Sequence, residues 1–257
     1  MSVKPVTIIG AHGKLPKRLS FSQGNSKLSD SIALFSLPAG HACPFASLCL
    51  AKADRKTGKI TDGLNSAFRC YATATEAMFK KVRESRWSNF EALKAAKTVN
   101  GMAALIGASL PAKSRLVRMH QSGDFFSQTY FDAWLQVARG RPGVIFYAYT
   151  KALPFWVARI DSIPSNMRLV ASIGGRRDDL IAEYNLRSVK VVYSAQEAVD
   201  LKLPIDHDDS HVWNYRGSFA ILLHGTQKAG SQASKDWQTI KSTTGGYKAD
   251  YFKATKN

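Results

Sequence analysis

The spacing of apolar residues changes from helical to strand-like near the middle of the chain. From Leu64 onward apolar residues recur every three or four positions, with Glu and Lys between them. A second stretch of this kind runs from Ser88, which we expect to cap it, to Ala108. These stretches predict two helices, the first of which would hold Cys70 in its opening turns. The first 35 residues contain one short apolar run, Val6 to Gly10, and predict loops with a strand pair at most.

Short aliphatic and aromatic runs dominate the second half of the chain. Each run has the length of a buried strand, and the segments between the runs have the spacing of helices. Strands that alternate with helices indicate parallel strands joined by crossover connections. The sequence therefore predicts an α/β fold with one parallel sheet of about five or six strands and crossover helices, either an open doubly wound sheet or a partial β/α barrel. The predicted strands are Leu116 to Met119, Val144 to Tyr149, Met167 to Ile173, Val189 to Tyr193 and Phe219 to His224, and the predicted helices are Gln128 to Ala138, Pro154 to Ile160 and Asp178 to Tyr184.

No internal repeat or interdomain linker divides the chain, so we expect residues 1–257 to form a single α/β domain. A hydrophobic content of 45% can fill its core. Within the domain we expect a loop-rich segment with the first cysteines (1–63), a core of helices and strands (64–225) and a polar C-terminal tail (226–257). A short amphipathic helix around Ala233 to Ile240 is predicted in the tail, without a role.

The balance of charge is strongly positive. Lys and Arg number 36 and Asp and Glu 19, which gives a formal net charge of +17 and favours polyanions such as nucleic acid as partners. The basic residues are spread along the chain, so an ordinary solvated surface explains them about as well. No stretch is long and apolar enough to cross a membrane, and the N-terminus lacks the apolar region of a signal peptide. We therefore expect a cytoplasmic protein without a membrane partner.

The three cysteines of the chain, Cys43, Cys49 and Cys70, all lie within residues 43–70. An odd number cannot pair off completely in disulfides, and Cys43 lies in the loop-like segment PAGHACPF, where core packing explains little. Thiolates are soft ligands, and three of them leave one corner of a zinc tetrahedron, or one iron of a 4Fe-4S cluster, for another group. The three cysteines are therefore candidate metal ligands, although buried free thiols remain an alternative. For zinc, the candidate fourth ligands are His41, His120 and His224.

Polar residues gather where the predicted strands end, in HQSGD, YTK and GGRR. Ligands of parallel α/β folds bind at the carboxyl ends of the strands, so these residues are candidates for a site that orients a ligand or moves protons. A simpler interpretation is that Asp124 caps the helix that begins near Ser127 and that Gly174 and Gly175 form only a turn. The candidate catalytic residues are Asp124, His120 and Lys151, and the candidate cofactor-binding residues are Gln121, Ser122, Gly174 and Arg176.

Several of these segments resemble the phage gene product 88 family, which is uncharacterised. The resemblance lies in ACPFASLC, in RCYA at Arg69 to Ala72, in HQSGDFFSQTYFDAW at His120 to Trp134 and in FYAYTK at Phe146 to Lys151. It spans roughly residues 35 to 200, and departs from the family in the 20 residues between Cys49 and Cys70 and in lacking further C-terminal cysteines. The resemblance implies a phage-encoded protein that works in the host cytoplasm, and it carries no reaction with it.

The cysteines followed by CYA at the start of an α/β chain also resemble radical S-adenosylmethionine proteins, although the C-x3-C-x2-C loop of those proteins is absent. That resemblance implies a 4Fe-4S cluster whose fourth iron binds S-adenosylmethionine. One hypothesis is therefore an iron-sulfur protein, or an iron-sulfur enzyme, with its cluster next to a strand-end site for an unknown small-molecule substrate or S-adenosylmethionine. The alternative is a zinc-stabilised basic protein that binds nucleic acid without catalysis, with Trp87, Trp134 or Trp237 available for stacking.

Overall fold

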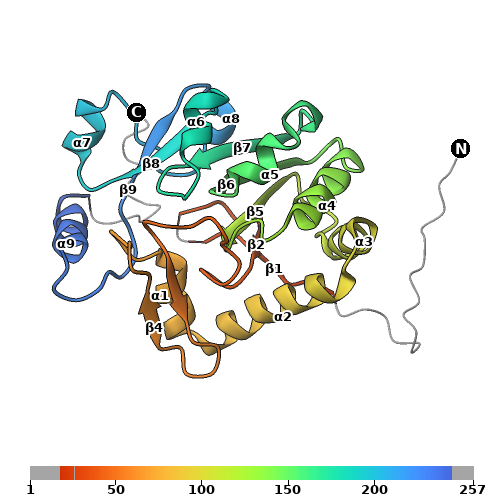
Figure 1. Cartoon of the computed structure of the whole chain (residues 1–257), viewed down its shortest axis with the longest axis horizontal. Helices are drawn as coiled ribbons and strands as arrows, with labels where there is room; N and C mark the ends of the chain where they lie inside the picture. Colours follow the sequence, from red (N-terminus) through yellow and green to blue (C-terminus); the bar gives the residue numbers. More distant parts are fainter. Residues whose placement is uncertain (1–17, 26, 245–257) are drawn as a thin grey trace, which may run out of the picture.

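A seven-stranded sheet forms the centre of the computed structural model, which describes residues 18–25 and 27–244 (Figure 1). Its six parallel strands follow one another across the sheet in chain order, and β1 (Phe21–Gln23) adds an antiparallel edge next to β2. This consecutive order is the winding of a β/α barrel, whereas a doubly wound sheet reverses its order partway. The α/β prediction is confirmed. The parallel strands are β2 (Ile32–Ser36), β5 (Leu116–Ser122), β6 (Ile145–Thr150), β7 (Met167–Ser172), β8 (Ser188–Val192) and β9 (Phe219–Leu222).

Helices fill the crossovers between the parallel strands and cover one face of the sheet. Helix α4 (Gln128–Arg139), in the crossover from β5 to β6, begins after Ser127, whose Oγ accepts the Tyr130 N–H at 3.2 Å and so caps the helix. Trp134 on this helix is fully buried between the rings of Phe35 and Phe146. The prediction that Trp134 could stack on nucleic acid is therefore wrong. The shorter crossover helices are α5 (Leu153–Val157), α6 (Asp179–Glu183), α7 (Ala195–Asp200) and α8 (His211–Asn214), with a 3-10 turn at Ile160–Ser162.

The opposite face of the sheet is buried as well. Leu34, Tyr147, Val170, Val189 and Phe219 form a second core cluster, to which α8 contributes Val212. Strands that are buried on both faces are apolar along their whole length. This explains why the sequence shows continuous apolar runs, and why four of the parallel strands were located to within a few residues.

Three helices precede β5, and their predicted boundaries need correction. Helix α1 (Tyr71–Met78) begins after Cys70, its N-cap residue, and not at Leu64, because the chain before it is hydrogen-bonded to the backbone of Leu48 and Leu50. The predicted helix from Ser88 to Ala108 is two helices, α2 (Lys80–Ala96) and α3 (Val99–Ser109). Lys97 breaks it by adopting a φ of 57°, and the Thr98 side chain caps α3 by accepting the Gly101 N–H at 3.0 Å. Ser88 lies inside α2, so the prediction that it caps a helix is wrong.

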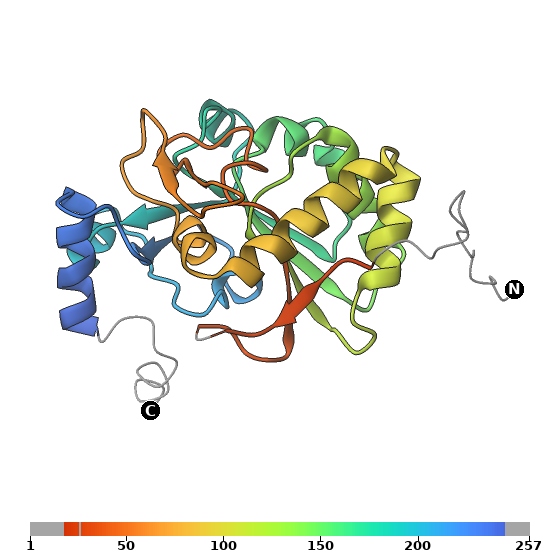
Figure 2. The same ribbon diagram turned by 90° about the horizontal axis from the view of Figure 1, so that it is seen from below.

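Helix α2 runs past the edge of the sheet that contains β1 and β2 (Figure 2). The side-chain amide of Asn89 on this helix donates to the carbonyl oxygens of Ser20 and Ser36, at 2.9 and 3.1 Å. The small strand pair β3 (Ala51–Ala53) and β4 (Ile60–Asp62) packs against α1. The sequence did not predict this pair. The strand pair that it allowed in the first 35 residues is observed as the antiparallel pair of β1 and β2, whereas the parallel pairing of β2 with β5 was not predicted. The apolar run from Val6 to Gly10 lies outside the described residues.

Helix α9 (Gln232–Thr244) lies beside α7 at the β9 end of the sheet (Figure 1). It contains the helix predicted around Ala233 to Ile240, and these two residues are buried against Leu222 and Leu223. Among the described residues, none of the helices is long and apolar enough to span a membrane.

Candidate functional site

A cavity of about 540 Å³ lies at the carboxyl ends of the parallel strands, within the usual size range of small-molecule sites. Residues at the ends of β5, β6, β7 and β9 line it, together with residues of the loop after β2 and of α9. His224, a candidate zinc ligand, and Trp237 lie on its wall, and so do eight of the ten residues predicted as cysteine ligands, catalytic residues or cofactor-binding residues. These eight are Cys43, Cys49, Cys70, His120, Gln121, Ser122, Asp124 and Lys151.

Two of the three cysteines lie in a loop that is fixed to the end of β7. Ala46 forms a bridge with Gly175, the backbone amides of Ser47 and Leu48 both donate to Gly174 O, and the Arg176 N–H donates to Phe45 O at 2.9 Å. Gly174 has a φ of +100°, which favours glycine, and Leu48 packs where its Cβ would be. The loop between Cys43 and Cys49 is therefore held by backbone hydrogen bonds, by Leu48 and by the Phe45 ring, whose centre lies 5.3 Å from that of Phe155.

The predicted cofactor-binding residues Gly174 and Arg176 lie beside this cysteine loop and not among the residues that line the cavity. The N–H groups of Gly174 and Gly175 donate to the carboxylate of Asp178, at 2.7 and 2.9 Å. Arg176 is exposed. In the described structure this turn therefore supports the cysteine loop.

The three thiols are half-buried, free of disulfides and close enough to influence one another electrostatically. Burial raises the pKa of Cys43, and the charges of Asp124, Cys70 and Cys49 raise it further. Burial, followed by the charge of Cys49, raises the pKa of Cys70 to about 11. Cys43 and Cys70 are therefore protonated at neutral pH unless a cation is bound to them.

Within residues 18–25 and 27–244, no group of three or more His, Cys, Asp and Glu side chains is arranged to hold a metal ion. The candidate zinc-ligating histidines have other partners. His41 Nε2 lies 3.1 Å from Ala53 O, His120 Nε2 lies 3.1 Å from the Tyr130 hydroxyl, and His224 Nδ1 lies 2.9 Å from Leu222 O.

Asp124 is the buried carboxylate of the cavity. Its Oδ1 accepts hydrogen bonds from the Thr150 hydroxyl at 2.6 Å and the Phe125 N–H at 2.8 Å, and its Oδ2 accepts the Lys151 N–H at 2.8 Å. Burial raises the pKa of Asp124 to about 6 although these hydrogen bonds oppose the shift. The carboxyl group can therefore take up or release a proton near neutral pH. Asp124 does not cap α4, because Ser127 does.

Lys151 and His120 have fixed surroundings. The Lys151 ammonium donates to Ser172 O, Ser172 Oγ and Ile173 O at 2.8 to 2.9 Å, which ties the end of β6 to the end of β7. Burial, with a smaller effect of Arg118, lowers the pKa of His120 to about 3. His120 is therefore neutral at physiological pH, and its Nδ1 is buried without a hydrogen-bond partner among the described residues.

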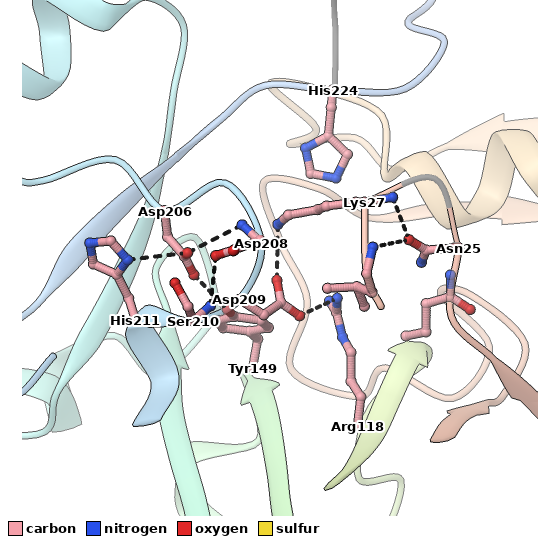
Figure 3. Close-up of polar contacts among 12 residues, drawn as sticks. Asn25, Lys27, Arg118, Tyr149, Asp206, Asp208, Asp209, Ser210, His211 and His224 are labelled. Atoms are coloured by element: carbon pink, nitrogen blue, oxygen red, sulfur yellow. Dashed lines mark hydrogen bonds and ion pairs between the residues drawn. The ribbon is translucent and has the colours of Figure 1, made fainter. Parts of the chain in front are cut away.

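A buried charge network that the sequence analysis missed also reaches the cavity (Figure 3). Asp209 is fully buried, and it accepts Arg118 Nη1 at 2.7 Å, Lys27 Nζ at 2.9 Å and the Tyr147 hydroxyl at 3.1 Å. The arginine in the otherwise apolar strand sequence LVRMH could have drawn attention to Arg118. No local pattern marks Lys27 and Asp209, which lie 182 residues apart.

Comparison with known proteins gives one family. The model of the gene product 88 family matches residues 14–243. The chain is similar to the Gene 88 protein of Mycobacterium phage L5, with 33% identity over 125 residues, 45% of this chain and 46% of that protein. The Gene 88 protein of Mycobacterium phage D29 is 31% identical over 125 residues, 45% of each chain.

The aligned stretch covers about half the length of these curated relatives. No solved structure matches the chain. Neither the family model nor the phage relatives supports the resemblance to radical S-adenosylmethionine proteins. The family match spans most of the sequence, and the chain therefore belongs to the gene product 88 family.

Proposed function

We propose that this protein binds a 4Fe-4S cluster through Cys43, Cys49 and Cys70 and a small-molecule ligand beside it in the same cavity. The observation that carries the proposal is that all three cysteines of the chain line one cavity, although 20 residues separate Cys49 from Cys70 in the sequence. Three thiolates leave one iron of such a cluster open to a ligand. Asp124 lies on the same cavity wall.

The donor set fits a cluster better than a single ion. The ligands of one zinc ion lie about 4 Å apart, since each Zn–S bond is about 2.3 Å long, and the described residues contain no group arranged to hold one ion. In a cluster each thiolate binds its own iron, so the thiolates are more widely separated. The charges of neighbouring thiolates raise the pKa of Cys43, and a bound cationic cluster would relieve this repulsion.

When bound, the cluster would supply electrons or a Lewis-acidic iron. The protein's own residues have separate roles beside it. Asp124, whose pKa is about 6, holds or releases a proton. His120 is neutral and can accept or donate a hydrogen bond through Nδ1. Lys151 is a positioning residue, because its three hydrogen bonds fix the strand ends around Asp124.

The resemblance of the cysteine segment makes S-adenosylmethionine the first ligand to test. The consecutive strand order supports this choice, because it puts the cysteine loop directly after the first parallel strand, β2, at the carboxyl edge of the sheet. The test adds S-adenosylmethionine to the reduced, iron-loaded protein and records the electron paramagnetic resonance spectrum. A changed cluster signal supports this ligand, and an unchanged signal excludes it while the cluster assignment stands.

Iron and sulfide analysis of protein purified without oxygen tests the cluster itself. We expect about four irons and four sulfides per chain and a brown colour. The variants Cys43→Ser, Cys49→Ser and Cys70→Ser should lose the iron, the sulfide and the colour. Ser47→Ala is the matched control, because Ser47 lies in the same loop outside the cavity lining, and it should keep its iron. Folded wild-type protein that is colourless and free of iron after anaerobic purification overturns the proposal.

The alternative function is a zinc-stabilised protein that binds nucleic acid, and the observation that favours it is the net charge of +17. It predicts one zinc per chain in place of iron, and affinity for DNA or RNA that falls steeply with salt and is unchanged in Asp124→Ala. Trp87 and Trp237 are half-buried and remain candidates for stacking. Failure to shift either nucleic acid in a gel at low salt rejects this alternative.

A further inference from the structure

Cations outnumber anions on the wall of the cavity. Two of the cations already have carboxylates nearby: Arg69 makes two hydrogen bonds to Asp62, at 2.9 and 2.7 Å, and Lys151 lies beside Asp124. The other cations at the centre of the cavity share one partner, since Lys27 binds Oδ1 of Asp209 and Arg118 binds Oδ2. The lining cations are Lys27, Arg69, Arg118, Lys151 and Lys241, and the lining carboxylates are Asp124 and Asp209.

Arg118 is nine-tenths buried, and part of its guanidinium is unused. Its Nη1 binds Asp209 and its Nε donates to His120 O at 3.3 Å, while the guanidinium lies 5.1 Å from the centre of the Tyr149 ring. No described residue accepts a hydrogen bond from its Nη2. Arg118 lines the cavity, and the oxygen of a carboxylate or phosphate is the acceptor that guanidinium groups favour.

The other carboxylates near this corner have their own partners. Asp206 is fully buried outside the cavity lining, where it accepts the Tyr149 hydroxyl at 3.3 Å and lies 3.2 Å from His211 Nδ1. Asp208 accepts the Ser210 N–H at 3.1 Å. Figure 3 shows Lys27 and Arg118 reaching Asp209 from two sides, with His224 next to Lys27.

His224 also lines the cavity. Burial is the main reason why its pKa falls to about 4, and the charges of Lys27 and Arg118 lower it further. His224 is therefore neutral at physiological pH and adds no charge of its own. An anion would enter a cavity whose central side chains are two cations, one carboxylate and neutral hydrogen-bonding groups.

We propose that Arg118 and Lys27 form an anion-binding subsite, and that the ligand of this cavity is a small molecule with a carboxylate or a phosphate group. The inference rests on the proposed function in one respect, because it names the class of the small molecule that lies beside the cysteines. It requires the cavity and its charges, and it does not require the cluster.

Thermal unfolding and calorimetric titration of the full-length protein test the subsite. The probes are inorganic phosphate and succinate, each compared with chloride at equal ionic strength. We expect a higher melting temperature with phosphate or succinate and no change with chloride. Stabilisation by phosphate alone assigns a phosphate ligand, and stabilisation by succinate alone assigns a carboxylate.

Some variants are expected to weaken anion binding and another to strengthen it, which distinguishes a direct role in binding from a role in folding. Arg118→Met and Lys27→Met should weaken binding of the active probe about tenfold or more, because each removes a charge-assisted hydrogen bond. Asp209→Asn should strengthen it several-fold, because it removes the carboxylate that competes with the ligand for both cations. If the three side chains only stabilised the fold, all three variants should bind the probe anion more weakly. Arg115→Met, which removes an exposed arginine just before β5, should leave affinity unchanged.

Two results overturn the proposal. The first is that neither phosphate nor succinate binds or raises the melting temperature more than chloride does, in the wild type and in Asp209→Asn alike. The other is a folded Arg118→Met variant that binds the probe as tightly as the wild type. The same titration on the Cys43→Ser variant tests anion binding independently of the cluster. If this iron-free protein still binds the anion, the subsite proposal holds even if the iron analysis rejects the cluster.

Discussion

Glu76 on α1 joins three segments around the cysteines, and we predict that Glu76→Ala destabilises the protein by about 3 to 5 kcal/mol. Glu76 is fully buried, and its Oε1 accepts the Ala39 N–H and Arg86 Nη1, both at 2.8 Å, and the Ser122 hydroxyl at 3.4 Å. Removing the carboxylate leaves the buried guanidinium of Arg86 without its counter-charge. It also leaves the Ala39 N–H without an acceptor, a loss of about 1 to 3 kcal/mol that we count within the total.

Thermal unfolding measures this effect. A loss of 3 to 5 kcal/mol should lower the melting temperature by on the order of 10 °C, at about 2 to 4 °C for each kcal/mol in a chain of this size. Glu84→Ala is the control, because Glu84 forms an ion pair with Lys80 at 3.8 Å in which both side chains are mostly exposed. The control should change stability by less than about 0.5 kcal/mol. A loss of under about 1 kcal/mol in Glu76→Ala would refute the reasoning.

The remaining predictions concern two residues directly after β5, Gly123 and Asp124, and one residue of α3, Gly107. Because burial raises the pKa of Asp124 to about 6, the iron-free wild type should lose stability as the pH rises from about 4 to 6, by up to about 3 kcal/mol. Asp124→Asn should abolish this dependence of stability on pH. Identical pH profiles of melting temperature for the iron-free wild type and Asp124→Asn would contradict the prediction. Gly123→Ala should destabilise by more than about 1 kcal/mol, since Gly123 has a φ of +80° and a Cβ would lie 2.6 Å from Leu37 Cβ. Gly107→Ala, in α3 with open space at that position, should instead stabilise by about 0.5 to 1 kcal/mol, and a loss of stability there would be unexpected.

The sequence predicted the strands that are buried on both faces and misjudged the segments whose conformation depends on distant contacts. β6, β7, β8 and β9 are mostly apolar runs, with Arg168 in β7 and Lys190 in β8 as their charged residues, and such runs are visible without a partner strand. The break between α2 and α3 is made by Lys97 with a positive φ, and neither glycine nor proline marks it. Strand β2 has only five residues, and its place beside β5 is fixed by pairing with a segment more than 80 residues away.

The candidate site was predictable where its residues are unusual in type or lie at strand ends. The three cysteines and Asp124 stood out for these reasons, and all four line the cavity. Lys27 and Asp209 are ordinary loop residues in the sequence, and only the fold brings them to Arg118. Gly174 resembled a ligand-binding turn, but its carbonyl group accepts hydrogen bonds from the cysteine loop.

The contact between the turn after β7 and the loop that holds Cys43 and Cys49 has a consequence for assembly. Many small metal-binding domains are unfolded until metal arrives, so that loading and folding occur together. Here amide and carbonyl groups already align the segment from Phe45 to Leu48 without any inorganic partner. For the proposed cluster these contacts predict a loop that is aligned before loading, so chemical reconstitution of the purified protein is a practical experiment.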